Sequence, residues 1–145
     1  MKIKIIVVLL AIVAAACGGG KKETVPPSTT ATPPTYPDAY PLPINELRAD
    51  RGKTLFQSKC TTCHDLDRKV IGPPLRGVTQ RRTYNWMMNM ILYPDRWVKT
   101  DSVAKALHKE YNYVQMIIPG GITEDQAMAV IAYLQREDAQ SMSQP

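Results

Sequence analysis

Cysteine and histidine are scarce in this 145-residue sequence, which has only three Cys and two His. A structural zinc site needs four such ligands, usually as two paired clusters, and Cys17 lies far from the others in an apolar N-terminal segment. No stretch of strand length alternates apolar and polar residues. No βαβ pattern accompanies the C-x-x-C at Cys60 and Cys63, which argues against a thioredoxin-like site. These absences favour a single all-α domain without a zinc cluster.

Long apolar runs and clusters of one charge are also missing. The chain has 18 Lys and Arg against 13 Asp and Glu, but the basic residues are dispersed along it. Dispersed charge forms no basic patch of the kind that nucleic-acid binding needs, so we expect no nucleic-acid partner. The apolar stretch at residues 5–16 is shorter than the roughly 20 residues that span a bilayer.

The N-terminus has the order of an export signal. Lys2 and Lys4 form a basic start, residues 5–16 are apolar, and three alanines stand directly before Cys17. This order is typical of a signal peptide over residues 1–16. A cysteine after three small residues resembles a bacterial lipobox, although Leu is commoner than Ala at the first position of that motif. We expect lipidation of Cys17 and a membrane-anchored lipoprotein facing the periplasm; the alternative is cleavage that leaves Cys17 unmodified.

Proline dominates the segment that follows. Residues 18–43 hold seven of the twelve prolines and almost no large aliphatic residue, so this segment cannot bury enough apolar surface to fold. Proline also keeps such a chain extended. We therefore expect residues 17–44 to form a disordered tether between the lipidated Cys17 and the following domain.

The stretch that carries chemistry is Cys60-Thr61-Thr62-Cys63-His64. Its C-x-x-C-H spacing is the attachment signature of a c-type haem. Residues three and four apart share one face of a helical turn. Two sulfurs can therefore bond to one edge of a porphyrin while the His64 imidazole lies beneath the ring centre as an axial iron ligand. One such motif predicts one covalent haem per chain.

The domain is expected at residues 45–138, followed by a disordered tail at 139–145. Helical stretches are legible in it at about residues 45–59, 84–92, 102–111 and from 124 onwards. Pro94 is expected to end the second stretch. The last stretch has the clearest start, because Thr123 and Gln126 match a capping box ahead of apolar residues at helical spacing.

The chain resembles the class I cytochrome c family over nearly all of residues 46–136. The resemblance rests on three runs in the order of the family: G-x-x-L-F-x-x-x-C-x-x-C-H at 52–64, G-P-P-L-x-G-V at 72–78, and I-T-E-D followed by V-I-A-Y-L within 122–134. It implies the cytochrome c fold, in which the first and last helices cross at right angles. Gly52 and Phe56 would meet Val130 and Tyr133 at that crossing.

The resemblance also implies further site residues. The carbonyl of Pro73 would accept a hydrogen bond from the ring N–H of His64, which orients the imidazole, and Arg81 would lie near the haem propionates. For the sixth iron ligand the resemblance favours Met116, in the loop before the last helix, although the family usually has proline directly after this methionine. His108, the other histidine besides His64, is the alternative and would give a bis-histidine iron of lower potential.

The methionines of the second helical stretch are expected to be core residues. Met87, Met88 and Met90 fall inside the helix expected at 84–92, where methionine usually fills gaps between helices. The order of candidates for the sixth position is therefore Met116, then His108, then an open or different site.

A six-coordinate haem iron has no vacant position for a substrate. We therefore expect an electron carrier rather than an enzyme, with no small-molecule substrate. Its partners would be redox proteins, such as a quinol-oxidising complex and a terminal oxidase or reductase, and the membrane through the lipid anchor. The alternatives are a fixed haem subunit of a larger membrane redox complex, or a gas- or peroxide-binding haem protein if the distal position is open.

Cations flank the haem motif and the loop that follows it: Lys53, Lys59, Arg68, Lys69 and Arg76. Exposed charges around an interface steer an oppositely charged partner. One hypothesis is that some of these residues ring the haem edge and attract an acidic partner. The alternative is an evenly charged surface.

Overall fold

The structure is a computed structural model that describes residues 33–143. Within this range it contains helices and no strand, which confirms the all-α prediction. The helices are α1 (Glu46–Lys59), α2 (Val78–Arg81), α3 (Tyr84–Leu92), α4 (Pro94–Thr100), α5 (Ser102–Glu110) and α6 (Glu124–Met142). In the described range, no helix has both the length and the apolar character to cross a membrane. The signal peptide expected at 1–16, the expected lipidation site Cys17 and residues 18–32 of the expected tether lie outside the described residues.

The predicted helices begin at side-chain caps. The capping residues are Asn45, Thr83, Asp101 and Thr123. Each side-chain oxygen accepts a hydrogen bond from the backbone N–H three residues further on, which satisfies a donor that the helix itself leaves free. At α6 the predicted capping box is complete, since Gln126 Oε1 also accepts from the N–H of Thr123 at 3.0 Å.

Two short helices have no counterpart among the helices predicted from the sequence. α2 is a single turn that follows Gly77, whose φ of 71° is left-handed. α4 begins at Pro94, which was predicted only as the end of α3. Because the fixed φ of proline suits the first turn of a helix, the residue that stops one helix also starts the next, with Tyr93 between them.

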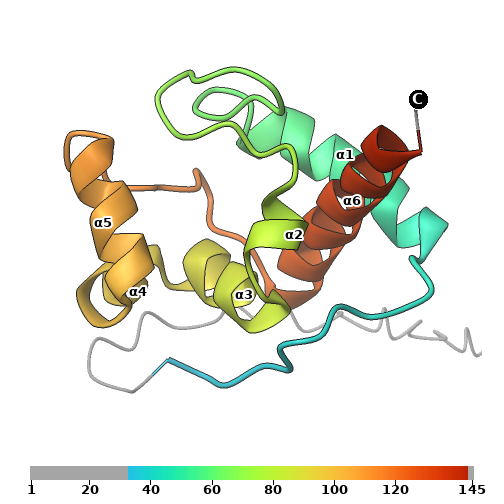
Figure 1. Cartoon of the computed structure of the whole chain (residues 1–145), viewed down its shortest axis with the longest axis horizontal. Helices are drawn as coiled ribbons and strands as arrows, with labels where there is room; N and C mark the ends of the chain where they lie inside the picture. The colour runs from blue at the N-terminus through green and yellow to red at the C-terminus, as the bar shows by residue number, and fades with distance from the viewer. Residues whose placement is uncertain (1–32, 144–145) are drawn as a thin grey trace, which may run out of the picture.

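α1 and α6 cross and form the central packing of the fold (Figure 1). Gly52 faces the backbone of α6: a Cβ at this position would overlap the carbonyl oxygen of Ala129 and lie 2.9 Å from the Cβ of Tyr133. Nearby, the rings of Phe56 and Tyr133 pack with their centroids 5.4 Å apart. Glycine is therefore required at position 52 for the close approach of the two helices.

Residues 33–44 are part of the folded domain, contrary to the tether predicted at 17–44. The backbone N–H of Tyr36 donates to Asn85 of α3 at 2.9 Å. The hydroxyl of Tyr40 donates to a backbone carbonyl just before α3 at 2.7 Å. Both rings pack against the core, and the segment runs beneath α3 (Figure 1). These two aromatic rings bury apolar surface against the core, which the proline-rich composition of the segment did not indicate.

The tail predicted at 139–145 is helical as far as Met142. Asp138, near the expected end of the domain, has a buried carboxylate that accepts a hydrogen bond from the N–H of Gly77 at 2.5 Å. It also accepts from Thr79, whose N–H donates at 3.0 Å and whose hydroxyl donates at 2.6 Å. No glycine or proline follows Asp138 before Pro145, so the sequence carries no stop signal for the helix at residue 138. Asp138 joins the end of α6 to the turn that starts α2.

Replacing Asp138 with alanine should lower the free energy of unfolding by about 3 kcal/mol, because two N–H groups and one hydroxyl lose their acceptor in a partly buried place. Chemical denaturation followed by circular dichroism measures the change. Asp125→Ala is the matched control, since it removes an exposed carboxylate of α6 that pairs with Arg51 at 2.8 Å, and exposed pairs contribute little. Equal losses in the two variants would contradict the role of Asp138.

Candidate haem site

A cavity of about 360 Å³ lies among α3, α5, α6 and the loops that follow α1 and α5. This volume is within the range of about 300–1,000 Å³ that is usual for cofactor and ligand sites. The cavity lining includes the site residues expected from the sequence between 45 and 138, together with the alternative ligand: Cys60, Cys63, His64, Pro73, Arg81, His108 and Met116. The fold thus brings three separate segments of the chain to one place.

The C-x-x-C-H motif continues α1 as one further turn. Cys60 is the C-terminal cap of α1 and donates its N–H to the carbonyl of Phe56 at 2.9 Å. The carbonyl of Cys60 then accepts from the N–H of Cys63 at 3.0 Å and of His64 at 2.8 Å. These local hydrogen bonds place all three side chains on the same wall of the cavity, as the spacing predicts.

The ring of His64 is held by the loop that follows the motif. Its Nδ1 lies 3.0 Å from the carbonyl oxygen of Pro73. A carbonyl can only accept, so Nδ1 carries the proton and Nε2 keeps the lone pair that a metal needs. Burial lowers the pKa of His64, and the hydrogen bond to Pro73 raises it in part. The imidazole is therefore neutral at pH 7, the form that binds metals.

Gly72 is a functional position that the sequence analysis did not single out. A Cβ at Gly72 would overlap the ring of His64, and its N–H donates to the carbonyl of Cys63 at 2.8 Å. Only glycine allows the backbone to lie this close to the imidazole. In the sequence, the feature that could have indicated this position is a glycine directly before two prolines.

Cys60 lacks the lowered thiol pKa that is typical of a redox-active pair. Cys60 and Cys63 are both free cysteines rather than a disulfide. Burial raises the pKa of the Cys60 thiol to about 11, while Lys59 acts in the opposite direction. Thiol–disulfide exchange proteins instead hold a thiol whose pKa is lowered. The geometry therefore does not support the thioredoxin-like alternative.

Met116 reaches the cavity from the loop between α5 and α6. It is half-buried, packs against the core and lines the cavity together with His64. From α3, Met87 and Met90 also line the cavity, whereas Met88 is fully buried in the core. The expectation that all three methionines of α3 only fill the core is therefore too simple, because α3 forms one wall of the cavity.

The His108 side chain is partly enclosed, although most other residues of α5 are exposed. Its side chain is half-buried, lines the cavity and meets the ring of Tyr113 edge-on with centroids 5.5 Å apart. In the described part of the chain, its Nε2 is buried and has no hydrogen-bond partner. Because Nε2 has almost no accessible surface, it is not exposed to a group in the cavity. This burial is the reason to expect Met116 rather than His108 as the second residue that would bind the iron.

The loop that carries Met116 is attached at both ends. Near its end, Lys59 Nζ donates to the carbonyls of Pro119 at 2.9 Å and Gly121 at 3.1 Å. Near its start, Lys69 Nζ lies 4.5 Å from the centre of the Tyr111 ring. Each lysine comes from the side of the cavity that carries the C-x-x-C-H motif. They therefore hold the loop across the cavity.

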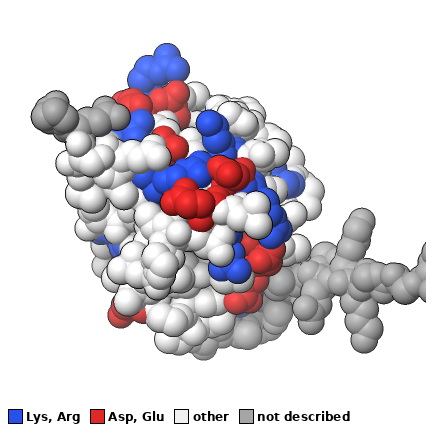
Figure 2. Space-filling view, turned by 90° about the vertical axis from the view of Figure 1, so that its right-hand side faces the viewer, with Lys and Arg blue, Asp and Glu red and all other residues white. Residues whose placement is uncertain are grey.

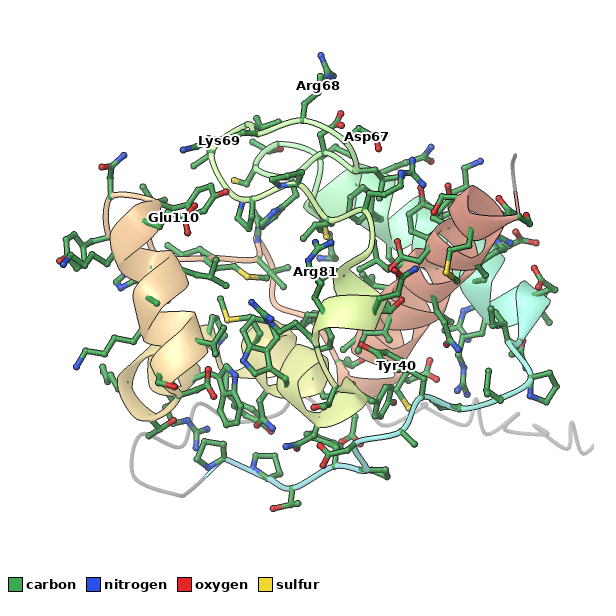
Figure 3. The ribbon with its side chains drawn as sticks, in the orientation of Figure 1. Tyr40, Asp67, Arg68, Lys69, Arg81 and Glu110 are labelled. Atoms are coloured by element: carbon green, nitrogen blue, oxygen red, sulfur yellow. The ribbon has the colours of Figure 1, made fainter. Side chains whose placement is uncertain are left out.

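Two guanidinium groups stand at the cavity wall. Arg81 donates from Nη1 to the carbonyl of Arg76 at 2.8 Å, and Figure 3 shows it extending from α2 towards the middle of the molecule. Arg82, which the sequence analysis did not name, also lines the cavity and lies 5.1 Å from the Trp86 ring. Guanidinium groups bind carboxylates well, and haem carries two of them.

The fold and this site define the class of the protein: an all-α haem protein of the c type. The chain belongs to the cytochrome c family, whose sequence profile, described as "Cytochrome c", matches residues 49–137.

Similar proteins agree with this assignment. A "Cytochrome c-553-like" protein of Synechocystis sp. is 40% identical over 45 residues, which are 30% of this chain. The chain spans only 43% of the length of that relative. The solved structure of cytochrome c from Rhodothermus marinus is 34% identical, covers 74% of this chain and 90% of its own, and has a TM-score of 0.68. An engineered form bound to a carbene intermediate is 35% identical, covers 73% and 90%, and has a TM-score of 0.66.

The cofactor of this chain is one covalently attached c-type haem, as in its family. The residues present fit that group. The cavity is lined by two free thiols, by a neutral imidazole fixed through Nδ1, and by the arginines of α2 and its C-terminal cap. The contact of Gly72 with the imidazole ring shows that the backbone is shaped around His64.

Proposed function

We propose that this chain is a single-haem electron carrier and not an enzyme. It would be exported, anchored to a membrane through Cys17, and pass one electron at a time between redox proteins such as a quinol-oxidising complex and a terminal oxidase or reductase. One observation carries the proposal: Cys60, Cys63 and His64 line the same cavity as Met116. The C-x-x-C-H motif would hold the cofactor, and the loop that carries Met116 would close the cavity.

Each residue has a distinct role in this proposal. Cys60 and Cys63 would form the covalent attachment to haem, and His64 Nε2 and Met116 Sδ would bind its iron. Bound haem supplies an iron that takes up and releases one electron. Pro73 fixes the imidazole through Nδ1 at 3.0 Å, and the apolar lining limits the access of water. With His64 and Met116 both bound to the iron, no position would be left for a substrate.

Electrochemistry of the full-length protein tests the proposal. The protein should be purified from a host that exports it and has haem-maturation machinery. We expect a c-type spectrum on reduction, a reversible one-electron wave, and no binding of carbon monoxide to the reduced protein. Binding of carbon monoxide to the wild type would show an open distal position and favour a gas-binding function instead.

The lipid anchor is tested independently of the haem. Metabolic labelling with a fatty acid should mark the wild-type protein, whereas Cys17→Ser should remain unlabelled while keeping its haem. Recovery of the wild type entirely in the soluble exported fraction would contradict the anchor.

A further inference from the structure

Residues 33–44 are bound along α3 in a regular way, and we call them the N-terminal strap. Every second residue in part of the strap makes a hydrogen bond to α3 or to the residue pair just before it: Pro34, Tyr36, Asp38 and Tyr40. In an extended chain, residues two apart face the same way. One edge of the strap is therefore fixed to the domain over seven consecutive residues.

Two asparagines of α3 hold the first part of the strap. Asn85 Oδ1 accepts from the N–H of Tyr36 at 2.9 Å, and Asn89 Nδ2 donates to the carbonyl of Pro34 at 3.0 Å. Asn89 is only 1% exposed, and a buried amide is costly unless it is hydrogen-bonded. The buried amide of Asn89 therefore indicates that the strap is a permanent part of the domain.

The opposite face of α3 forms a wall of the haem cavity. Successive residues of an α-helix are about 100° apart around its axis, at 3.6 residues per turn, so Asn85 and Asn89 share one face. Met87 and Met90 fall on the other side of the helix and line the cavity. The strap and the cofactor site therefore lie on the two sides of one short helix.

The strap also fixes the junction between α2 and α3. The hydroxyl of Tyr40 donates to the carbonyl of Arg82 at 2.7 Å. Burial raises the pKa of this hydroxyl, so it keeps its proton and remains a donor. The carbonyl of Asp38 accepts from the N–H of Tyr84 at 3.0 Å, which is one of the donors that the start of α3 leaves free. Backbone groups on both sides of Thr83 are therefore held by the strap.

The residue that Tyr40 holds brings a charge to the cavity. Arg82 lines the cavity, and its guanidinium carbon lies 5.1 Å from the centre of the Trp86 ring. Its Nη1 also donates to the carbonyl of Arg81 at 2.8 Å. Trp86 lines the cavity as well and donates from Nε1 to Asp101 at 2.9 Å. The positive charge of Arg82 therefore has a defined place beside the cofactor site.

Among the described residues, no carboxylate lines the cavity to offset this charge. On the face of the molecule that carries α1 and α6, by contrast, Lys and Arg lie beside Asp and Glu (Figure 2), as in the pair Arg136–Asp50 at 2.7 Å. A cation beside an iron stabilises its reduced form by Coulomb's law, because reduction removes one positive charge. The position of Arg82 should therefore influence the reduction potential of the haem.

We propose that the N-terminal strap is a positioning element of the haem site and that Tyr40 is its positioning residue. The hydroxyl of Tyr40 holds the backbone of Arg82, and the fixed backbone keeps the guanidinium at the cavity. The strap thereby raises the reduction potential of the bound haem. The segment that follows the proposed lipid anchor is then part of the redox site as well as a connection to it. This proposal rests on the electron-carrier function proposed above and adds a determinant of its potential.

Reduction potentials of the haem-loaded full chain test the proposal. They are measured by redox titration followed in the visible spectrum, which needs no partner protein. Arg82→Gln removes the charge, and we expect about a tenfold rise in the oxidised-to-reduced ratio at a fixed potential, which is a fall of about 59 mV for a one-electron couple. Tyr40→Phe keeps the ring, which packs edge-on against Tyr84 with centroids 5.7 Å apart. It should raise the same ratio about threefold, because the charge is displaced and not removed.

Tyr36→Phe is the matched control. It removes a hydroxyl from the same strap, but that hydroxyl bonds to the side chain of Tyr93, which is not among the residues that line the cavity. We expect a similar loss of stability in the two tyrosine variants, because each loses one hydrogen bond, and an unchanged potential in Tyr36→Phe. The double variant Tyr40→Phe/Arg82→Gln should have the potential of Arg82→Gln alone, since Tyr40 acts through Arg82.

Each other result contradicts the proposal in its own way. Equal falls in potential for Tyr36→Phe and Tyr40→Phe would show only a general loosening of the strap. An unchanged potential in Tyr40→Phe, or a double variant whose fall is the sum of the two single ones, would show that Tyr40 does not act through Arg82. An unchanged potential in Arg82→Gln would show that its charge does not influence the haem.

Failure of the proposed function would be recognised separately. Reduced wild-type protein that binds carbon monoxide would contradict the electron-carrier function. The potentials of the wild type and the four variants would still decide the role of the strap, because the titration follows the haem itself.

Discussion

Replacing both Cys60 and Cys63 with alanine is expected to remove covalent haem completely. The two sulfurs lie on one turn, held by the hydrogen bond from the N–H of Cys63 to the carbonyl of Cys60 at 3.0 Å. His64 remains in the variant, but a coordinate bond to iron does not survive denaturation. Mass spectrometry of the denatured protein should show a haem-sized addition in the wild type and none in the double variant.

A third cysteine provides the control for this experiment. Cys17→Ser also removes a thiol, yet it should keep the full haem addition, because Cys17 is outside the C-x-x-C-H motif. Acid–acetone extraction is a second check on the wild type. Release of the haem under those conditions would contradict covalent attachment, whatever the variants show.

Replacing Met116 with alanine is expected to open the iron to carbon monoxide. The wild-type reduced protein should bind none, whereas the variant should bind one equivalent, because alanine has no donor atom. The weak near-infrared methionine–iron absorption of the oxidised protein, which the family resemblance implies, should disappear at the same time. Absorption spectroscopy with and without carbon monoxide measures both effects.

The nearest competing side chains supply the controls for Met116. His108→Ala should leave both signals unchanged, since the Nε2 of His108 is enclosed by protein. Met90→Leu removes a second sulfur from the cavity lining and should also leave them unchanged. If the His108 change is the one that opens the iron, Met116 is not the ligand and a bis-histidine site of lower potential replaces it.

Features that depend on near neighbours in the chain were predictable from the residues alone. The C-x-x-C-H spacing specifies one turn, and that turn brings its three side chains to one wall. The capping box at Thr123 locates the start of α6 within one residue, since its two hydrogen bonds are local. The close helix crossing at Gly52 is different, because it joins distant residues and was expected only from the family resemblance; the structure contains it.

Other features depend on contacts between segments that are far apart in the sequence. Composition alone assigned residues 33–44 to a tether, but Tyr36 and Tyr40 find partners around α3. Asp138, at the expected end of the domain, is buried because its carboxylate finds donors near α2. In both places the deciding partner is more than 40 residues away in the sequence.

The environments of His108 and Lys59 also depend on contacts that the sequence does not reveal. From the sequence, His108 was the alternative ligand and Lys59 was one of five cations in the hypothesis of an attracted acidic partner. In the folded chain, His108 Nε2 is enclosed and Lys59 is bound to the loop that carries Met116. Residue type and spacing determine what a side chain can bind and on which face of its own helix it stands. Only the packing of helices and loops determines whether that face meets solvent, a cofactor or another part of the chain, because burial and charge pairing are properties of the assembled neighbours.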